Sequence, residues 1–196
     1  MKTNKDTIIN TFDTITRDTM LSLEKTQRDF WNISRATAEF LYLSIIEHNA
    51  QNVLEIGTSN GYSGLWISKA LKKTGGKLTT IEYYSKRQDI AIENFTKCGT
   101  IDIITPLIGS ACDVIREFPA STKFDFIFVD ANKRESIDYF NLIHPHLIKG
   151  GIYTCDNVLS HKEKVQPFID AINNHSDYEN VVLQLPAGLS FARKLR

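Results

Sequence analysis

The side chains best suited to chemistry in this 196-residue chain lie in two short segments, each at the end of a stretch that predicts a buried strand. Asp130 ends the first apolar stretch, and Lys133 follows three residues later. Asp156 ends the second stretch and is followed by Asn157. Because parallel strands bring their carboxyl ends to one edge of a sheet, we expect these four side chains to lie close together.

Two carboxylates and an amide oxygen are hard ligands, which Mg²⁺ and similar divalent ions prefer, so Asp130, Asp156 and Asn157 are candidate metal ligands. Such an ion could hold two vicinal hydroxyls of a small molecule and lower the pKa of one. Lys133 would lie beside that hydroxyl, and a lysine whose pKa is depressed by a cation can accept a proton. In the plainer alternative, the two acids cap the segments that follow them and Asn157 is a turn residue.

Hydrophobic patterns predict the elements that must position these residues. We expect strands at 53–56, 77–82, 101–108, 124–130, 152–156, 178–185 and 189–194, and helices at 35–48, 62–71, 85–97, 134–148 and 161–175. The helix at 134–148 should be broken near His144-Pro145 and ended by Lys149-Gly150-Gly151. The alternation of strands and helices along the chain predicts one α/β domain with a Rossmann-like fold. This fold has a mostly parallel seven-stranded sheet with helices on both faces.

The stretch 53–63 joins the first predicted strand to a helix through a loop with two glycines. Such a loop offers backbone N–H groups and a helix N-terminus to a nucleotide-like ligand. The glycines are Gly57 and Gly61, with Ser59 where the dinucleotide pattern G-x-G-x-x-G has its middle glycine. A Walker loop would need Gly-Lys-Ser/Thr, which this stretch lacks. The acidic Glu55 inside the strand suits a ligand with positive charge better than a pyrophosphate.

Glu82 ends the predicted strand 77–82, about 20 residues beyond the glycine loop, where a carboxylate can hold a ribose hydroxyl pair. The neighbouring Tyr83 could lie against an adenine ring. The alternative is that Glu82 is an acid favoured by the N-terminus of the helix at 85–97. The spacing from Gly61 favours the ribose interpretation.

The overall composition is that of an ordinary globular domain, with 42% hydrophobic residues and a formal net charge of zero. A neutral chain lacks the charge footprint of a nucleic-acid binder, although a local patch could be hidden in the total. The three cysteines form no C-x-x-C pair, which favours a reduced, cytoplasmic location over a disulfide framework or zinc site. We expect no membrane association, since neither a membrane span nor a signal peptide is evident.

Several segments resemble those of class I methyltransferases that depend on S-adenosylmethionine (SAM). The segments 54–57 (LEIG) and 61–63 (GYS) are similar to the first motif of the catechol and caffeoyl-CoA O-methyltransferase group and its bacterial members. The segment 128–133 (FVDANK) resembles the Phe-Val-Asp-Ala-x-Lys segment of that group, and 156–158 (DNV) matches the second half of its metal site. The resemblance runs over about 34–194.

The resemblance implies a SAM-dependent O-methyltransferase that acts on a hydroxyl of a small catechol-like acceptor with Mg²⁺ assistance. It assigns catalysis to Lys133 and Asp130, and metal binding to Asp130, Asp156 and Asn157. The residues expected to bind SAM, from the resemblance and from the spacing above, are Glu55, Gly57, Ser59, Gly61, Tyr62, Ser63, Glu82, Tyr83, Ala111 and Asp130. The family also implies a homodimer.

Three alternatives remain open. Bacterial relatives that methylate a hydroxyuridine in transfer RNA keep the same motifs, so an RNA acceptor is the nearest alternative. Basic residues gathered around one mouth would support it: Lys162, Lys164, Arg193, Lys194 and Arg196. A nicotinamide-dependent oxidoreductase is disfavoured by the missing third glycine. A SAM-binding regulator without turnover is disfavoured by the intact metal and lysine set.

The N-terminal region, 1–33, is predicted to be a helical extension of the methyltransferase domain at 34–196. Ile8, Phe12 and Ile15 fall at i, i+4 and i+7 and predict a narrow apolar stripe. The extension could simply pack on the domain, cover the substrate as a lid, or form a dimer contact. Three smaller predictions concern the domain itself. Ser34 should cap the helix at 35–48. His161 is either a solvated helix-start residue or a polar residue of the substrate pocket. Asp113 could bond the edge of an adenine or favour a helix N-terminus.

Overall fold

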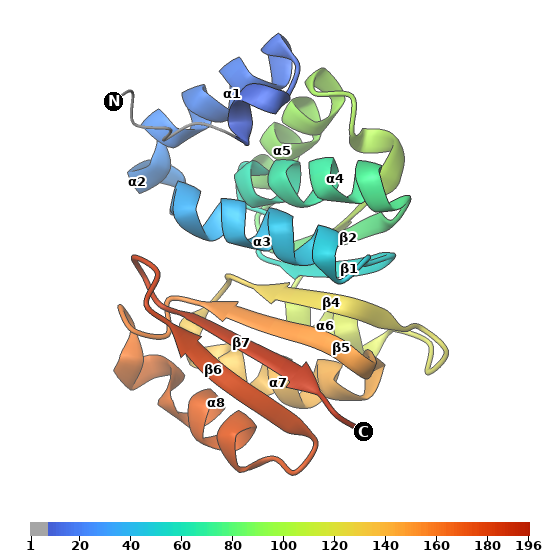
Figure 1. Cartoon of the computed structure of the whole chain (residues 1–196), viewed down its shortest axis with the longest axis vertical. Helices are drawn as coiled ribbons and strands as arrows, with labels where there is room; N and C mark the ends of the chain where they lie inside the picture. Colours follow the sequence, from blue (N-terminus) through green and yellow to red (C-terminus); the bar gives the residue numbers. More distant parts are fainter. Residues whose placement is uncertain (1–7) are drawn as a thin grey trace.

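The computed structural model describes residues 8–196, and a seven-stranded sheet forms its centre (Figure 1). The strands are β1 (Asn52–Ile56), β2 (Lys77–Glu82), β3 (Ile104–Ile108), β4 (Phe124–Val129), β5 (Leu147–Asp156), β6 (Tyr178–Leu183) and β7 (Leu189–Lys194). Their order is β3-β2-β1-β4-β5-β7-β6, and β7 runs antiparallel to both β5 and β6. The predicted mostly parallel sheet of seven strands is confirmed.

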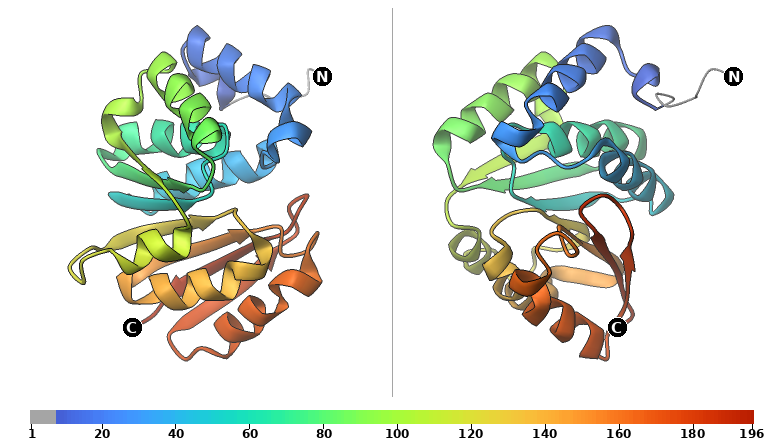
Figure 2. Two further views of the ribbon diagram at one scale, coloured as in Figure 1. Left: turned by 180° about the vertical axis from the view of Figure 1, so that it is seen from behind. Right: turned by 90° about the vertical axis from the view of Figure 1, so that its left-hand side faces the viewer.

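Helices cover both faces of this sheet, as Figure 2 shows. They are α1 (Thr14–Lys25), α2 (Gln27–Phe30), α3 (Arg35–Glu47), α4 (Tyr62–Thr74), α5 (Ser85–Lys97), α6 (Ala111–Arg116), α7 (Ser136–Ile143) and α8 (Lys162–Asn174). Four short 3₁₀ turns are η1 (Ile9–Thr11), η2 (Ile101–Ile103), η3 (Lys133–Glu135) and η4 (His144–His146). Core residues of α1, α3, α4 and α5 form one cluster, and those of α6, α7 and α8 form a second. Within residues 8–196, no helix is both long enough and apolar enough to span a bilayer.

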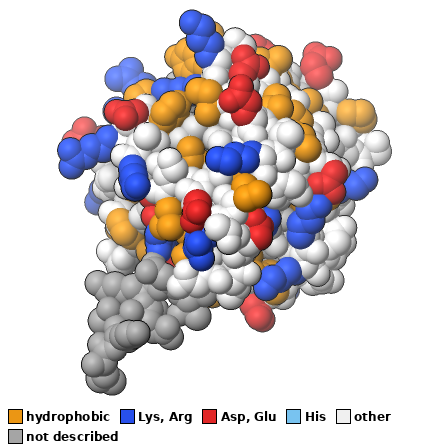
Figure 3. All heavy atoms as spheres, turned by 90° about the horizontal axis from the view of Figure 1, so that it is seen from above, with side chains coloured by type: hydrophobic (Ala, Val, Ile, Leu, Met, Phe, Trp, Pro, Cys, Tyr) orange, Lys and Arg blue, Asp and Glu red, His pale blue; other side chains and the backbone are white. Residues whose placement is uncertain are grey.

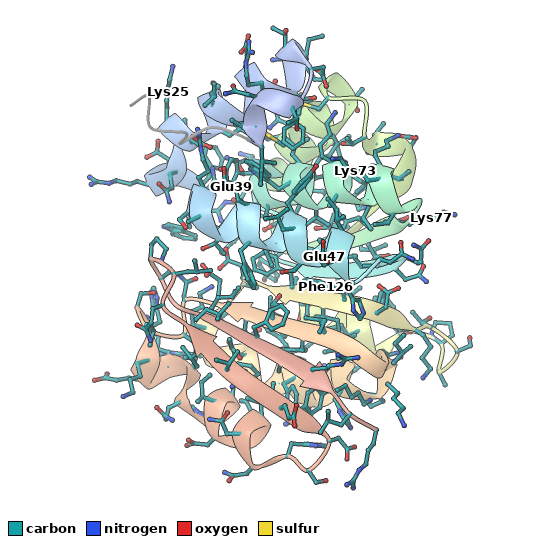
Figure 4. All side chains as sticks on the ribbon, in the orientation of Figure 1. Lys25, Glu39, Glu47, Lys73, Lys77 and Phe126 are labelled. Atoms are coloured by element: carbon teal, nitrogen blue, oxygen red, sulfur yellow. The ribbon has the colours of Figure 1, made fainter. Side chains whose placement is uncertain are left out.

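Strand β4 illustrates why the centre of the sheet is buried on both faces. Phe126 and Phe128 belong to the core beneath α3 and α4, whereas Ile127 and Val129 belong to the core over α7 and α8. Figure 4 shows Phe126 on β4 beneath α3. Full burial of each such side chain stabilises the fold by roughly 1.5–3 kcal/mol. An apolar run without alternation therefore becomes a central strand, which carries Asp130 to the sheet edge.

The N-terminal stripe that we predicted does not form. Helix α1 begins after Asp13, whose carboxylate accepts a hydrogen bond from the Thr16 N–H at 2.9 Å and so caps the helix. Ile15 is 55% exposed, and Phe12 lies outside the helix, where its ring packs edge-on against Trp66. A side-chain cap thus overrides the apolar periodicity. Residues 1–7 of the predicted N-terminal extension lie outside the described residues.

Two other predicted boundaries are wrong. The segment 147–151 was expected to end a helix, but it begins β5, where Leu147 pairs with Phe124. The helix ends at Ile143 because Pro145 has no N–H to continue its hydrogen bonds. The segment 101–103 forms the turn η2 instead of starting the third strand.

Candidate functional site

A cavity of about 1030 Å³ opens where the strand order reverses beside β1. The helices that follow β1 and β4 lie on opposite faces, and in such sheets ligands bind outside the carboxyl ends of the strands at this point. Loops from five strands contribute to the lining, which includes Gly57, Ser59, Ser63, Glu82, Tyr83, Ala111, Asp130, Lys133, Asp156 and Asn157. The structure therefore brings together ten of the residues that we predicted for the site.

Gly57 allows the loops after β1 and β4 to touch. Its φ is +103°, and a Cβ at this position would lie 2.3 Å from the carbonyl oxygen of Asp130. The Gly57 N–H donates to the Ile81 carbonyl at 2.9 Å, and the Asp130 N–H donates to the Ile56 carbonyl at 2.9 Å. The backbones of three strands are thus joined directly beneath the cavity, and the first glycine of the motif sets the position of Asp130.

Glu82 combines two tasks at the end of β2. Its carboxylate accepts hydrogen bonds from the backbone N–H groups of Ser59 at 2.8 Å and Tyr84 at 3.0 Å, which holds the glycine loop in place. Each carboxylate oxygen has a further lone pair, so this buried side chain can also accept from a ligand in the cavity that it lines. Tyr83 lines the same cavity, is 66% exposed, and packs edge-on against the Tyr84 ring at 5.0 Å.

Glu55 lies behind the glycine loop and does not line the cavity. Its side chain is fully buried and accepts hydrogen bonds from Ser63 Oγ at 2.5 Å and Thr80 Oγ1 at 2.6 Å. Burial raises the pKa of Glu55 to about 7, although both hydrogen bonds oppose this change. The expectation of a direct ligand contact through Glu55 is not supported, because the acid faces inward and braces the strand to the helix.

The buried carboxyl of Glu55 should make stability depend on pH. Between its ordinary pKa of 4.5 and the folded value of about 7, the folded chain keeps a proton that the unfolded chain releases, so stability falls as pH rises. We expect Glu55→Gln not to lose stability in this way. As pH rises from 4.5 to about 7, its melting temperature should therefore increase by several degrees relative to that of wild type. Thermal melts at several pH values would test this, with the exposed Glu93→Gln as control. A difference in melting temperature between Glu55→Gln and wild type that does not change with pH would contradict the assignment of this pH dependence to Glu55.

Gly61 and Tyr62 also lie outside the cavity lining. A Cβ on Gly61 would lie 2.9 Å from the Phe95 ring of α5, so this glycine serves the packing of helix on helix. Tyr62 is 1% exposed and donates its hydroxyl hydrogen bond to Glu24 Oε1 at 2.7 Å. Glu24 also pairs with Arg35, so α1 is tied both to the loop and to the start of α3.

The four residues with which the sequence argument began meet at the ends of β4 and β5. Lys133 Nζ donates to Asp130 Oδ1 at 2.5 Å, and both side chains are largely buried. Asp156 is 2% exposed, and its Oδ1 has no hydrogen-bond partner within the described chain. Burial and then the charge of Asp130 raise the pKa of Asp156 to about 7. Asn157 adopts a left-handed φ of +65°, which turns the chain at the cavity.

This arrangement fits a divalent cation. A buried carboxylate oxygen without a partner is costly, and two neighbouring carboxylates repel each other. A cation held by Asp130, Asp156 and the Asn157 amide oxygen would remove both costs, and all three donors are oxygens of the kind that Mg²⁺ prefers.

The segment before α3 supplies cavity residues that the sequence argument did not assign to the site: Gln27, Arg28, Phe30, Trp31, Asn32, Ile33 and Ser34. The Phe30 carbonyl accepts a hydrogen bond from Ser59 Oγ at 2.7 Å. The guanidinium of Arg87 lies 4.6 Å from the centre of the Trp31 ring. The segment therefore contacts the glycine loop and α5, and the aromatic pair at 30–31 was its only local signal. Its role as lid or dimer contact, like the division at residue 34, stays a prediction.

A short loop between β6 and β7 completes the wall near Asn157. Pro186 and Ala187 line the cavity. The Ala187 carbonyl accepts a hydrogen bond from the Leu159 N–H, and the Gly188 carbonyl accepts one from the Val158 N–H, both at 3.1 Å.

Two other residues considered for the pocket, His161 and Asp113, differ in whether they line the cavity. His161 lines the cavity at the start of α8, where it is exposed. Asp113 does not line it; its exposed carboxylate pairs with Arg116.

The five basic residues proposed for an RNA acceptor do not gather around one mouth. Lys164 lines the main cavity, whereas Arg193 and Lys194 line a separate hollow beside Lys149. Lys194 is buried and donates to the His144 and Leu147 carbonyls. Figure 3 shows that, on the face seen from above, the described Lys and Arg side chains are interspersed with Asp and Glu. The basic cluster that would have supported an RNA acceptor is therefore not found among the described residues.

Comparison with known proteins agrees with the geometry. A model of the family described as O-methyltransferase matches residues 11–191. The catechol O-methyltransferase of Niastella koreensis is 32% identical over 130 residues, covering 65% of this chain and 58% of that protein. Caffeoyl-CoA O-methyltransferase 1 of Arabidopsis thaliana is 32% identical over 151 residues, covering 74% of this chain and 58% of that protein. The chain thus spans less than two thirds of the length of these curated relatives.

Solved structures share the fold at low sequence identity. The O-methyltransferase TomG from Streptomyces achromogenes, solved in complex with SAM, superimposes with a TM-score of 0.82 at 24% identity, covering 94% of this chain and 91% of that chain. The O-methyltransferase from Bacillus cereus, solved in complex with SAH, gives a TM-score of 0.84 at 24% identity, covering 96% of this chain and 94% of that chain. With the family match over nearly its whole length, this chain belongs to the O-methyltransferase family.

Proposed function

We propose that this protein is a SAM-dependent O-methyltransferase that transfers a methyl group to a hydroxyl of a small catechol-like acceptor, assisted by a divalent cation such as Mg²⁺. The proposal rests on family membership and on one observation above all. At the cavity edge, the Lys133–Asp130 pair lies beside a buried Asp156 oxygen that has no partner among residues 8–196. The oxidoreductase alternative receives no support from the family match.

The donor half of the cavity is the wall formed after β1, β2 and β3. When bound, SAM supplies a methyl group on a sulfonium, which is transferred by in-line displacement. Glu82 accepts hydrogen bonds from ribose hydroxyls, Tyr83 stacks on the adenine, and Ala111 leaves room for the ring. Asp130 and the buried Glu55 place acidic groups near the sulfonium end, although Glu55 acts from behind the loop.

The acceptor half is the wall formed after β4 and β5. A bound divalent ion would lower the pKa of an acceptor hydroxyl. Lys133, which lines the same wall, would accept the proton of that hydroxyl on Nζ. The Asp130 carboxylate pairs with Lys133 Nζ at 2.5 Å, and a cation that shared Asp130 would weaken this pair. The residues of this wall therefore bind the acceptor, orient it towards the methyl group and remove its proton.

A methyl-transfer assay on a panel of catechols, with and without chelator, tests the proposal. Even residues that only support metal ligands cost about 10–100-fold when they are changed, so Asp156→Asn should lose at least about 100-fold. Chelator should produce a comparable loss in wild type and little further loss in the variant. The matched control is Asp138→Asn, an exposed acid on α7 outside the cavity lining. Activity that is unaffected by both Asp156→Asn and chelator would contradict a role for the metal, whereas the assignment of SAM as methyl donor would stand.

An acceptor with an anionic group is a second candidate, favoured by the charges at the cavity. Arg28, Arg134 and Lys164 line it, are exposed, and form no ion pair within residues 8–196. A phosphate or carboxylate on the acceptor could pair with them, as in an acyl-CoA ester or a transfer-RNA hydroxyuridine. Adding caffeoyl-CoA and transfer RNA to the panel separates these from simple catechols. Arg134→Gln should raise KM for the anionic acceptor alone.

We further propose that the protein is located in the cytoplasm and forms a homodimer.

A further inference from the structure

Two histidines and an aspartate meet at the opposite end of β5 from the cavity. His144 lies in η4, just before β5 begins, whereas Asp156 ends that strand at the cavity. His175 follows the last residue of α8, and Asp177 precedes β6. Each of the three offers one ligand atom, and these atoms all lie within 4.8 Å of one another. All three side chains are half-buried, and none of them lines the cavity.

The surrounding packing holds this group together. The imidazole rings of His144 and His175 have centroids 4.7 Å apart, and the Phe140 ring lies 6.0 Å and 5.9 Å from them. Tyr178 packs against both histidines, at 5.6 Å and 5.3 Å. The backbone of His144 is fixed as well, because its carbonyl accepts from Lys194 Nζ at 2.8 Å. The ligands therefore converge from two segments, η4 and the loop between α8 and β6, and the core contacts of the two histidines hold these segments together.

The donor set differs in kind from that of the cavity. Two imidazole nitrogens and one carboxylate oxygen suit Zn²⁺ or Co²⁺, whereas Mg²⁺ prefers oxygen donors alone. His144 Nδ1 lies 3.0 Å from the Tyr178 hydroxyl, and donation to that oxygen would leave Nε2 available to a metal. His175 Nδ1 accepts from the Asp177 N–H at 3.2 Å, so coordination through Nε2 requires the proton to move to Nδ1 and this long bond to be lost. Tetrahedral ligands about 2.1 Å from zinc lie about 3.4 Å apart, so small side-chain rotations close the site.

We propose that His144, His175 and Asp177 form a second metal site, specific for Zn²⁺-class ions, with water as the fourth ligand. It ties the end of α7 to the end of α8 and the start of β6, so an ion there stabilises the C-terminal half of the sheet. The ammonium of Lys194 lies nearby and opposes a cation, but the Asp177 carboxylate and the two carbonyls that Lys194 holds offset its charge. The site stands apart from the proposed Mg²⁺ site in position and in chemistry.

Thermal melts and cobalt absorption test this site. We expect ZnCl₂ at 100 times its Kd to raise the melting temperature by about 5–10 °C, because only the folded chain holds the three ligands together. CoCl₂ should give the intense visible absorption of four-coordinate cobalt. MgCl₂ should do neither at this site. All titrations are carried out on the full chain with Asp156→Asn, which disables the cavity donors, as well as on wild type.

Substitutions of the proposed ligands test whether Zn²⁺ binds at this site or elsewhere on the protein. His175→Gln and Asp177→Asn should each weaken Zn²⁺ binding by at least about tenfold and abolish the cobalt absorption. The matched control is His146→Gln, a histidine of the same turn whose Nδ1 contacts the Thr122 carbonyl instead. Zinc binding that persists in both ligand variants, or that disappears with Asp156→Asn alone, would overturn the proposal. Melts without metal show whether each variant folds.

Discussion

Replacement of Gly57 by alanine should lower the free energy of unfolding by about 2–4 kcal/mol and abolish SAM binding. The new Cβ would lie 2.3 Å from the Asp130 carbonyl oxygen and 2.8 Å from its carbonyl carbon. Both atoms belong to backbone that is fixed by a hydrogen bond to β1, so neither can rotate away. The loops after β1 and β4 must separate, which opens the wall that lines the donor half of the cavity. Urea denaturation and calorimetric titration with SAM measure the two effects.

Gly75→Ala provides the matched control for this prediction. Gly75 also has a left-handed φ, +81°, at the end of α4, but a Cβ there would meet nothing within 4 Å. It should therefore show only the backbone cost of about 1–2 kcal/mol, and SAM binding should be unchanged. Equal losses in the two variants would mean that backbone strain, and not the contact with Asp130, explains the requirement for glycine at position 57.

Lys133→Met should reduce methyl transfer by about 10²–10⁴-fold, the usual contribution of a positioned general base, with little change in SAM affinity. Its Nζ lies against Asp130 at the acceptor wall, and methionine keeps the length of the side chain without its proton acceptor. The loss should shrink as pH rises, because the acceptor hydroxyl then ionises without help. Initial rates across a pH series, with SAM saturating, measure this.

Two further variants distinguish proton transfer from simple charge at Lys133. Arginine stays protonated, so Lys133→Arg should restore the pair with Asp130 but not the activity. Lys164→Met removes another cavity-lining lysine, one that is exposed and outside the ion pair, and should retain most of the activity on a neutral catechol. A fully active Lys133→Arg enzyme would exclude the base role and leave Lys133 as an electrostatic contact.

Much of the frame of this site can be predicted from local patterns. The boundaries of β2 and α5 agree with the prediction residue for residue, and Ser34 caps α3 by accepting from the Thr37 N–H at 3.1 Å. Glycine spacing and strand-end acids likewise predicted which loops meet at the cavity. These features depend on the backbone preferences of a few neighbouring residues and on the spacing of their apolar side chains. They can therefore be predicted from the sequence alone.

Other features were settled by contacts between distant segments. Glu55 and Ser63 belong to the same motif, yet only Ser63 lines the cavity, because its hydroxyl and that of Thr80 on β2 hold the Glu55 carboxyl in the interior. The segment 27–34 reaches the cavity through its contacts with the glycine loop and α5. His144 and His175 meet because α7 and α8 share one core around Phe140. Such meetings depend on three-dimensional packing of whole elements, about which spacing along the chain carries little information.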